Sequence, residues 1–360
     1  MALEKFRAFM DVGRVQGVPV TAAIAILGGL TASPGPDLLD IIWLVIISIP
    51  AHMGGAALNE LWDRRLDSAV KELANKPLVS GALSPFEAKL LIAICAPLSL
   101  GMAFIVFGTV ALLAMSMATV WMYWYCTSGK RTFIVSDLAQ CVGFGSFALF
   151  GALAVGIPTS LTWPLVGIVA TLNLFAQWGN GLKDADNDRR FGIPSFAART
   201  GVTARQGLSA SHPYFIYGVG IKVAFLSFCT LPIFLAPVPM SYLFIVLALG
   251  CPVQYMTMRN FIGIKSRHRY VRLILGDLLL SYPAAAAISI MSAGLSGFLL
   301  LALFVFGGYL VASALQSGAE FKFGADAPKR QPVILAKRHG RLYIKGNPIM
   351  MSWMAKVAGR

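Results

Sequence analysis

The sequence predicts an all-α integral membrane protein, built as a bundle of nine to ten transmembrane helices. Of its 360 residues, 57% are hydrophobic and only 13% are charged, and the mean hydropathy is +0.71. A soluble protein carries about a quarter charged residues. The chain also contains a series of apolar runs long enough to span a membrane, and its basic residues gather in alternate connections between those runs. These three observations predict the fold class.

Apolar runs of about 18 residues or more are typical of membrane-spanning helices. Ten runs meet this description, at residues 15–32, 38–58, 89–107, 109–126, 133–156, 161–179, 214–236, 239–257, 272–293 and 296–315. The first run follows "MALEKFRAFMDVGR" without a small-residue cleavage site, so we expect a retained helix and not a signal peptide. A nine-helix arrangement, with one run re-entrant or at the interface, remains an alternative.

The distribution of Lys and Arg predicts the orientation in the membrane. The connections "TASPGPD", "TSLTW", "LAPVPMS" and "SAGLSG" and the turn at Gly108-Thr109 contain neither residue, whereas the other four loops and both termini are basic. This alternation is the positive-inside pattern, which with ten helices places both termini in the cytoplasm. The net charge of +14 therefore reflects one cationic face, which favours anionic lipids and phosphate-bearing ligands, and does not indicate nucleic-acid binding.

Two regions are expected, a membrane domain at residues 1–315 and a basic cytoplasmic tail at residues 316–360. The tail carries nine Lys and Arg residues. It is either a peripheral surface segment or a site for lipid or a partner. The five cysteines lie in or at the ends of apolar runs without paired spacing, so we expect packing residues and neither disulfides nor zinc ligands.

Two polar stretches at the ends of apolar runs share one spacing. "NELWDRRLD" at residues 59–67 and "NGLKDADND" at residues 180–188 both read Asn-x3-Asp-x3-Asp. Such residues lie within an arc of about 80° on a helix and therefore share one face. The first ladder is Asn59, Asp63 and Asp67, and the second ladder is Asn180, Asp184 and Asp188. Carboxylates one turn apart repel each other, so two facing ladders indicate a cation between them.

The ligand types predict which cation. Oxygen ligands without His or Cys select a hard ion, Mg²⁺ or Mn²⁺. Mg²⁺ usually takes one or two carboxylates and completes its shell with waters and substrate phosphates, so we expect a phosphorylated or diphosphorylated substrate. The alternative is that both ladders are solvated helix ends, paired with the neighbouring arginines. Two ladders of identical spacing on one membrane face favour the metal site.

Basic residues near the ladders complete a diphosphate site. Lys or Arg there could bind the non-bridging oxygens and stabilise a departing pyrophosphate. The candidates are Lys76, Lys183, Arg14, Lys130 and Arg131. Two further acids lie inside apolar runs; we expect Asp137 to contact the acceptor and Asp277 to pair with Arg272.

The ladder stretches resemble the signatures of the UbiA superfamily of intramembrane prenyltransferases. "NELWDRRLD" followed by "NKPLVSG" resembles the first signature, and "NGLKDADNDRRFGIPSFAARTG" resembles the second. "YCTSGKR" at residues 125–131 is similar to the Tyr-containing basic segment after helix four, and "VGRVQGVP" is similar to the region of the arginine before helix one. The similarity extends from Arg14 to Gly201. It departs from the family where Glu60 and Gly181 replace an Asp and Asn187 replaces a Gly.

The resemblance implies a Mg²⁺-dependent prenyltransferase with its active site at the cytoplasmic face. The metal would be held by Asp63, Asp67, Asp184 and Asp188, assisted by Asn59 and Asn180. A polyprenyl diphosphate would lose pyrophosphate, and an aromatic or quinone-precursor acceptor would capture the resulting allylic cation. Tyr125 is the aromatic residue expected to stabilise that cation.

Three other functions stay open. A non-aromatic acceptor would need the same ladders, and so would a UbiA-type terpene cyclase, in which the donor captures its own cation. A non-enzymatic transporter is disfavoured because the helix interiors are almost free of charge and the acids cluster at one face.

Overall fold

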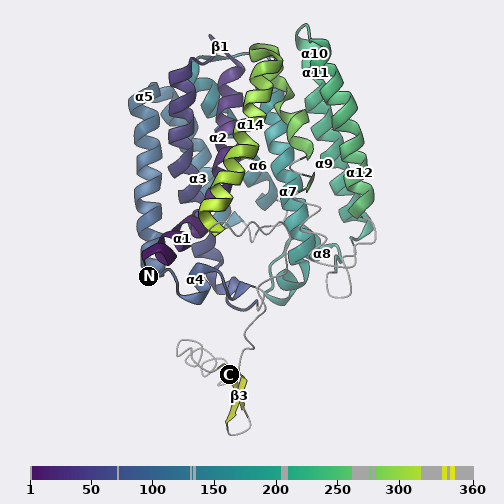
Figure 1. Cartoon of the computed structure of the whole chain (residues 1–360). Coiled ribbons are helices and arrows are strands. Elements are labelled where there is room, and N and C mark those ends of the chain that lie inside the picture. Colours follow the sequence, from purple (N-terminus) through teal and green to yellow (C-terminus); the bar gives the residue numbers. More distant parts are fainter. Residues whose placement is uncertain are drawn as a thin grey trace. The chain divides into compact units, whose positions relative to one another are not determined.

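The computed structural model describes residues 2–70, 73–129, 132, 135–203, 210–261, 276–277, 280–317, 335–338 and 341–344. The chain divides into two compact units, Met1–Phe321 and Lys322–Arg360. The first unit is a bundle of helices (Figure 1). In the second unit the described residues form an antiparallel hairpin of β3 (Leu335–Arg338) and β4 (Arg341–Ile344).

The helices of the first unit follow one another with short connections. In chain order they are α1 (Ala2–Val12), η1 (Val15–Gly17), α2 (Val18–Leu30), α3 (Leu38–Asp67), α4 (Pro77–Ser80), α5 (Pro85–Thr127), α6 (Val135–Val155), α7 (Thr162–Arg190), α8 (Phe196–Arg199), α9 (His212–Thr230), α10 (Pro232–Leu235), α11 (Met240–Phe244), η4 (Ile245–Gly250), α12 (Cys251–Phe261), η5 (Ala287–Ser289) and α14 (Ile290–Ser317). Two short strands, β1 (Ala32–Ser33) and β2 (Ile157–Pro158), pair antiparallel and tie the loop before α3 to the loop before α7.

Among the described residues, six helices are long and apolar enough to cross a membrane, or seven if the bent pair Leu3–Val12 and Val15–Leu30 is one span. This confirms the helical membrane fold but gives fewer spans than the ten apolar runs. One reason is that Pro85–Thr127 contains two of the predicted runs, and Leu280–Leu315 contains the run at 296–315 together with most of the run at 272–293. The count of nine or ten remains a prediction.

The element α5 doubles back at Gly108. Gly108 has φ 83° and ψ −170°, a conformation that glycine adopts readily and other residues rarely do. A Cβ on Gly54 of α3 would lie 3.0 Å from Cys95, and a Cβ on the adjacent Gly55 would lie 3.6 Å from Met122. A continuous helix would separate Cys95 from Met122 by about 40 Å, so the chain must reverse between them. The turn predicted at Gly108-Thr109 lies at this reversal.

The last described helix pair reverses in the same way. Gly294 has φ 66° and ψ −176° inside α14. The rings of Tyr282 and Phe306, on either side of it, lie 6.3 Å apart. The reversal falls within the predicted connection "SAGLSG".

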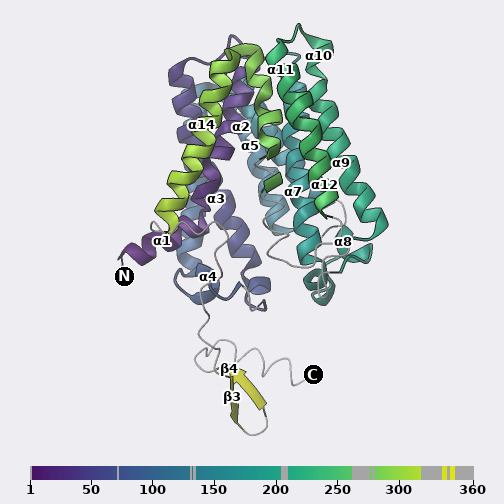
Figure 2. The ribbon, with the colours of Figure 1, turned by 45° about the vertical axis from the view of Figure 1, so that its right-hand side comes forward.

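Local sequence fixes where the helices next to the ladders begin. Asp37 and Asp40 form a capping box at the start of α3, and Ser84 and Glu87 form another at the start of α5. The short helices α4 and α8, which follow the two ladders, lie at the same end of the bundle, opposite α10 (Figures 1 and 2). Both ladders therefore end at one face.

One ion pair in the bundle interior was not predicted from the sequence. Lys222, at the middle of α9, lies with its Nζ 2.6 Å from Asp277 Oδ2, and the two side chains are 5% and 0% exposed. The ammonium also lies 3.5 Å from the centre of the Phe175 ring. The described part of the interior thus contains this ion pair, in which Lys222 is a partner of Asp277. Arg272, the predicted partner, lies outside the described residues.

Candidate active site

The first ladder occupies the last turns of α3. The Asn59 Nδ2 group donates a hydrogen bond to Asp63 Oδ2 at 3.3 Å, which places the two side chains on one face as predicted. Cys126 of α5 contacts Asn59 Oδ1 at 3.9 Å through its sulfur. Asp67 is the final residue of α3 and is buried. The ladder thus points into the bundle at Asn59 and reaches the loop before α4 at Asp67.

The second ladder occupies the end of α7 and is held by the segment that follows it. Ser195 Oγ donates to Asp188 Oδ2 at 2.6 Å, and the same Ser195 side chain caps α8 at Ala198. The backbone N–H of Ile193 donates to the carbonyl of Asp188 at 2.8 Å. The "GIPSFAAR" stretch therefore folds back on the helix end and orients its last carboxylate.

One acid of each ladder lies within electrostatic range of the other: Asp63 of α3 and Asp188 of α7. Tyr125 at the end of α5 joins the two sides, because its hydroxyl donates to Gln177 Oε1 of α7 at 3.0 Å and its ring lies within electrostatic range of Asp63. Tyr214 of α9 lies within the same range of Asp184 and Asp188. Acids from two distant parts of the sequence thus lie at the same end of the bundle.

A stack of aromatic side chains from α7 and α9 packs beside the second ladder. Trp178 stacks on Phe175 at 5.0 Å and on Tyr214 at 5.6 Å. Trp178 Nε1 donates to the carbonyl of Tyr214, and the Tyr214 hydroxyl donates to the carbonyl of Trp178. A Cβ on Gly181 would lie 2.2 Å from that hydroxyl. Gly181, one of the departures from the family pattern, thus leaves room for Tyr214.

A cluster of opposite charges lies beside the first ladder. Lys76 Nζ lies 2.8 Å from Asp67 Oδ2 and 2.9 Å from Glu60 Oε2. Arg14 also forms an ion pair with Glu60. Glu60 is only 6% exposed, so it needs these cationic partners. We call Arg14, Glu60, Lys76 and Asp67 the charge cluster.

Lys76 remains an ammonium in the cluster. Burial disfavours its charge, but the attraction of Glu60 and hydrogen bonds to Asp67 and Glu60 outweigh burial and raise the pKa of Lys76 above its ordinary value. A raised pKa means that the cluster keeps this positive charge below about pH 10.5 and loses it only as the pH rises through the folded-state pKa.

Arg14 reaches the cluster through an unusual backbone. It has φ 45° and ψ 49°, the left-handed conformation that is rare for residues other than glycine. This break between α1 and α2 directs the guanidinium to Glu60, and it leaves the Arg14 carbonyl 3.0 Å from His52 Nε2. The other ring nitrogen of His52 lies 2.7 Å from Thr21 Oγ1. Strain of this kind is found most often at functional sites.

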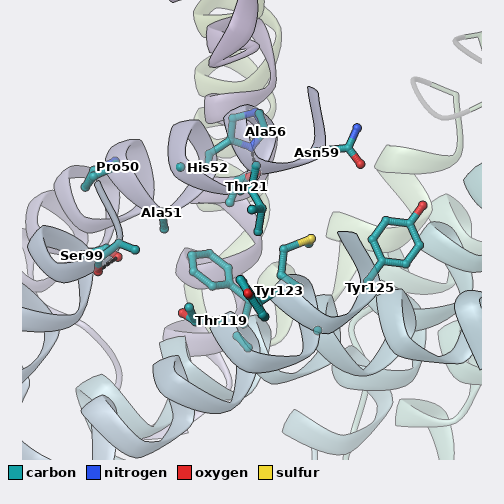
Figure 3. Close-up of a pocket in the computed structure, with 18 of the residues that line it drawn as sticks. Thr21, Pro50, Ala51, His52, Ala56, Asn59, Ser99, Thr119, Tyr123 and Tyr125 are labelled. Carbon is teal, nitrogen blue, oxygen red and sulfur yellow. Dashed lines mark hydrogen bonds between the residues drawn. The ribbon is translucent and has the colours of Figure 1, made fainter. Parts of the chain in front are cut away.

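A cavity of about 230 Å³ opens beside the first ladder between α2, α3, α5 and α6. Asn59 and Tyr125 lie at one end of it, and Pro50 and Ser99 lie at the other (Figure 3). Its walls are mostly small or apolar, including Gly54, Ala56, Met115, Ala118, Phe144 and Phe147. The hydroxyls of Ser99 and Thr119 are already bonded to helix carbonyls. The cavity therefore suits a hydrocarbon chain whose polar end lies at the ladder.

The donor set fits a hard divalent ion in its chemistry. The two ladders offer carboxylate and amide oxygens, the ligands that such an ion prefers, and Asp63 lies within electrostatic range of Asp188. Among the described residues no group of three or more His, Cys, Asp or Glu side chains is already close enough to hold a metal. Oxygens from a substrate phosphate would therefore have to complete the shell.

Three predicted diphosphate residues lie wholly or in part outside the described residues. Lys130 and Arg131 lie outside the described residues, and only the backbone of Lys183 is described, within α7. The structure thus places Asp63 within electrostatic range of Asp188 and Tyr125, and it places Lys76 and Arg14 beside the first ladder. Asp137, expected at the acceptor, accepts a hydrogen bond from Tyr217 of α9 at 3.0 Å.

Sequence reasoning missed three residues of the site. Glu60 could have been found, because it directly follows Asn59 in the first motif, where it stands in place of the family's Asp and keeps a carboxylate. Ser195 lies in a stretch that the motif includes, but nothing in its spacing indicates contact with Asp188. Nothing in the sequence indicates Gln177, since it lies 52 positions from its partner Tyr125 and on a different helix.

Comparison with known proteins identifies the family. Residues 18–273 match the UbiA prenyltransferase family. The chain is 29% identical over 203 residues to a digeranylgeranylglyceryl phosphate synthase of Korarchaeum cryptofilum. The alignment covers 55% of this chain and 69% of that protein. It is 27% identical over 178 residues to a 4-hydroxybenzoate solanesyltransferase of Synechocystis, covering 46% of this chain and 57% of that one.

Solved structures share the fold. The apo form of a UbiA homolog from Aeropyrum pernix K1 superposes with a TM-score of 0.62 at 18% identity, over 83% of this chain and 98% of that one. A UbiA homolog from Archaeoglobus fulgidus bound to GPP and Mg²⁺ superposes with a TM-score of 0.60 at 17% identity, over 78% of this chain and 99% of that one. With the family match over most of the chain, these findings show that the protein belongs to the UbiA prenyltransferase family and is a prenyltransferase.

Proposed function

We propose that the protein transfers a prenyl group from a polyprenyl diphosphate to a lipophilic or aromatic acceptor in a Mg²⁺-dependent reaction that releases pyrophosphate. The observation that carries this proposal is that Asp63 on α3 lies within electrostatic range of Asp188 on α7, next to an apolar cavity lined by Asn59 of the first ladder. Carboxylates near the end of an apolar cavity suit a substrate with an anionic head and an apolar tail. The Archaeoglobus fulgidus homolog binds ligands of this kind, GPP and Mg²⁺.

Each part of the site receives a role. We assign the metal to Asp63, Asp67, Asp184 and Asp188 with help from Asn59 and Asn180, and the diphosphate oxygens to Arg14, Lys76, Lys130, Arg131 and Lys183. A bound Mg²⁺ would offset charge on the leaving group, and Mn²⁺ is a possible substitute. The basic side chains would stabilise the same charge by ion pairing.

The remaining residues control the reactive carbon. Tyr125 is 7% exposed and its hydroxyl is held by Gln177, so its ring is fixed near the end of the cavity. When the donor C–O bond breaks, the electron pair leaves with pyrophosphate, and the ring face would stabilise the allylic cation. The acceptor then supplies the electron pair of the new bond and loses a proton. Apolar walls would keep water from capturing the cation first.

An aromatic or quinone-precursor acceptor is the first choice, and a non-aromatic acceptor the second. The relatives are named for both kinds, hydroxybenzoate and glyceryl phosphate. A membrane terpene cyclase would use the same ladders without an acceptor. A transporter is less favoured, because the one ionisable pair found at the middle of a described span, Lys222 with Asp277, is enclosed by packing.

The membrane arrangement is also a proposal. With nine or ten helices in residues 1–315, the ladders would face the cytoplasm, and with ten both termini would do so. The basic tail at residues 316–360 would lie on the same side.

The test is a direct assay of the first chemical event. Membranes that contain the protein are incubated with labelled prenyl diphosphates and a panel of acceptors, and released pyrophosphate is measured. We expect release that EDTA stops and added Mg²⁺ restores, because the leaving group needs its charge offset. Product mass distinguishes transfer from cyclisation. Release that is indifferent to chelation would contradict the metal-dependent reaction.

A further inference from the structure

We propose that Lys76 is a resident cation of the first ladder, which holds Asp67 until a divalent ion arrives together with a diphosphate and then moves to that diphosphate. The inference rests on the proposed function and adds to it how the metal and the diphosphate affect each other's binding. It predicts that metal alone binds weakly, and that metal and diphosphate bind cooperatively.

The geometry gives Lys76 two carboxylate partners. Its Nζ lies 2.8 Å from Asp67 Oδ2 and 2.9 Å from Glu60 Oε2. The side chains of Glu60 and Asp67 are 8% and 11% exposed, so the contacts are poorly screened by water. Hydrogen bonds between charged groups are stronger than those between neutral groups. Lys76 therefore neutralises the acid to which we assign the metal.

A divalent ion on Asp67 would compete with this ammonium. The oxygen that accepts from Lys76 has its charge already offset, and a dication beside the ammonium would be repelled at a distance of a few ångströms. Metal binding to Asp67 thus requires Lys76 to leave or to shift. Metal alone offers Lys76 no new anion.

Lys76 can leave Glu60 without making this buried carboxylate an unpaired charge. Glu60 keeps Arg14 as an ion-pair partner after Lys76 moves. The Lys76 side chain is 27% exposed, and a four-carbon stem allows its Nζ to swing while the backbone stays at the start of α4. A diphosphate beside the ladder would supply the anion that Asp67 gives up to the metal. Each ligand then lowers the cost of binding the other, which is thermodynamic coupling.

The test measures Mn²⁺ binding by electron paramagnetic resonance on purified full-length protein, with and without inorganic pyrophosphate. Lys76→Met should bind Mn²⁺ alone about tenfold more tightly than the unsubstituted protein, since one charged hydrogen bond no longer competes. Pyrophosphate should then enhance Mn²⁺ binding much less than it does in the unsubstituted protein. Lys76→Gln, which keeps a hydrogen-bond donor without the charge, is a second variant if Lys76→Met is poorly folded.

Arg65→Met is the matched control. Arg65 is exposed and lies on α3 between Asp63 and Asp67 in sequence, so this variant removes the same charge without removing the contact. Its Mn²⁺ affinity should stay within about twofold, because exposed charges are screened. Equal Mn²⁺ affinities in Lys76→Met, Lys76→Gln and the unsubstituted protein would overturn the inference while leaving the metal site intact. Absence of bound Mn²⁺ in every protein, with pyrophosphate present, would overturn the proposed function itself.

Discussion

At the scale of single residues, the site depends on carboxylates that repel one another, Asp63 with Asp67 and Asp184 with Asp188. Lys76 offsets Asp67 and Ser195 holds Asp188, while Asp63 has Asn59 as a neutral hydrogen-bond partner. Acids placed this way cost stability in the free protein and become favourable when a cation binds. Residues retained at such a cost indicate function more strongly than a well-packed core residue does.

Substitution of one acid on each ladder should therefore remove activity and keep the fold. We expect Asp63→Ala and Asp184→Ala to lower pyrophosphate release by at least about 10²-fold, because each removes charge that offsets the leaving group. Thermal unfolding in detergent should be unchanged or slightly higher. The control is Asp186→Asn, since Asp186 pairs with Arg189 and lies off the ladder face. Near-normal turnover in either ladder variant would contradict the assigned roles.

At the scale of helices, the second ladder is positioned by the contact between α7 and α9. Trp178 and Tyr214 exchange hydrogen bonds across this contact, and Gly218 lets the indole approach the α9 backbone. A Cβ on Gly218 would lie 2.5 Å from the Trp178 ring, closer than packed atoms allow. The indole is only two residues from Asn180, so a shift at this contact is transmitted to the ladder.

Gly218→Ala should consequently lower both stability and turnover. Overpacking of this kind costs about 1–3 kcal/mol, measurable as a lower midpoint of thermal unfolding in detergent. Gly220→Ala, two residues along α9, is the matched control because a Cβ there meets no atom within 4 Å. An unchanged midpoint for Gly218→Ala would show that the α7–α9 contact is looser than described.

The sequence predicted elements better than contacts. Hydropathy and turn residues placed α3, α6 and the reversal at Gly108, and helix periodicity placed Asn59 and Asp63 on one face. Neither could show that Lys222 pairs with Asp277 from another helix, because that pairing depends on tertiary packing over 55 positions. The hydrogen bond between Tyr125 and Gln177 could not be predicted for the same reason. Patterns along a helix predict its faces, and only the packed bundle decides what each face meets.

At the scale of the whole molecule, the basic loops and both ladders should lie on one side of the membrane. Ala74, in the loop after the first ladder, and Gly35, near β1, are both exposed. In a Cys251→Ser background, which removes the one exposed cysteine, Ala74→Cys should react with a membrane-impermeant thiol reagent only in inside-out vesicles. Gly35→Cys should react only in right-side-out vesicles. Labelling of both from one side would refute the topology.

The central claim is that the two ladders act together on one diphosphate. The most direct measurement is a cryo-electron microscopy structure of the protein with Mg²⁺ and a non-ionising thiolo analogue of a prenyl diphosphate. The account predicts metal density between the diphosphate and oxygens of both Asp63 and Asp188, with the hydrocarbon tail in the cavity lined by Met115 and Phe147. Metal and diphosphate bound by one ladder alone, or away from both, would contradict it.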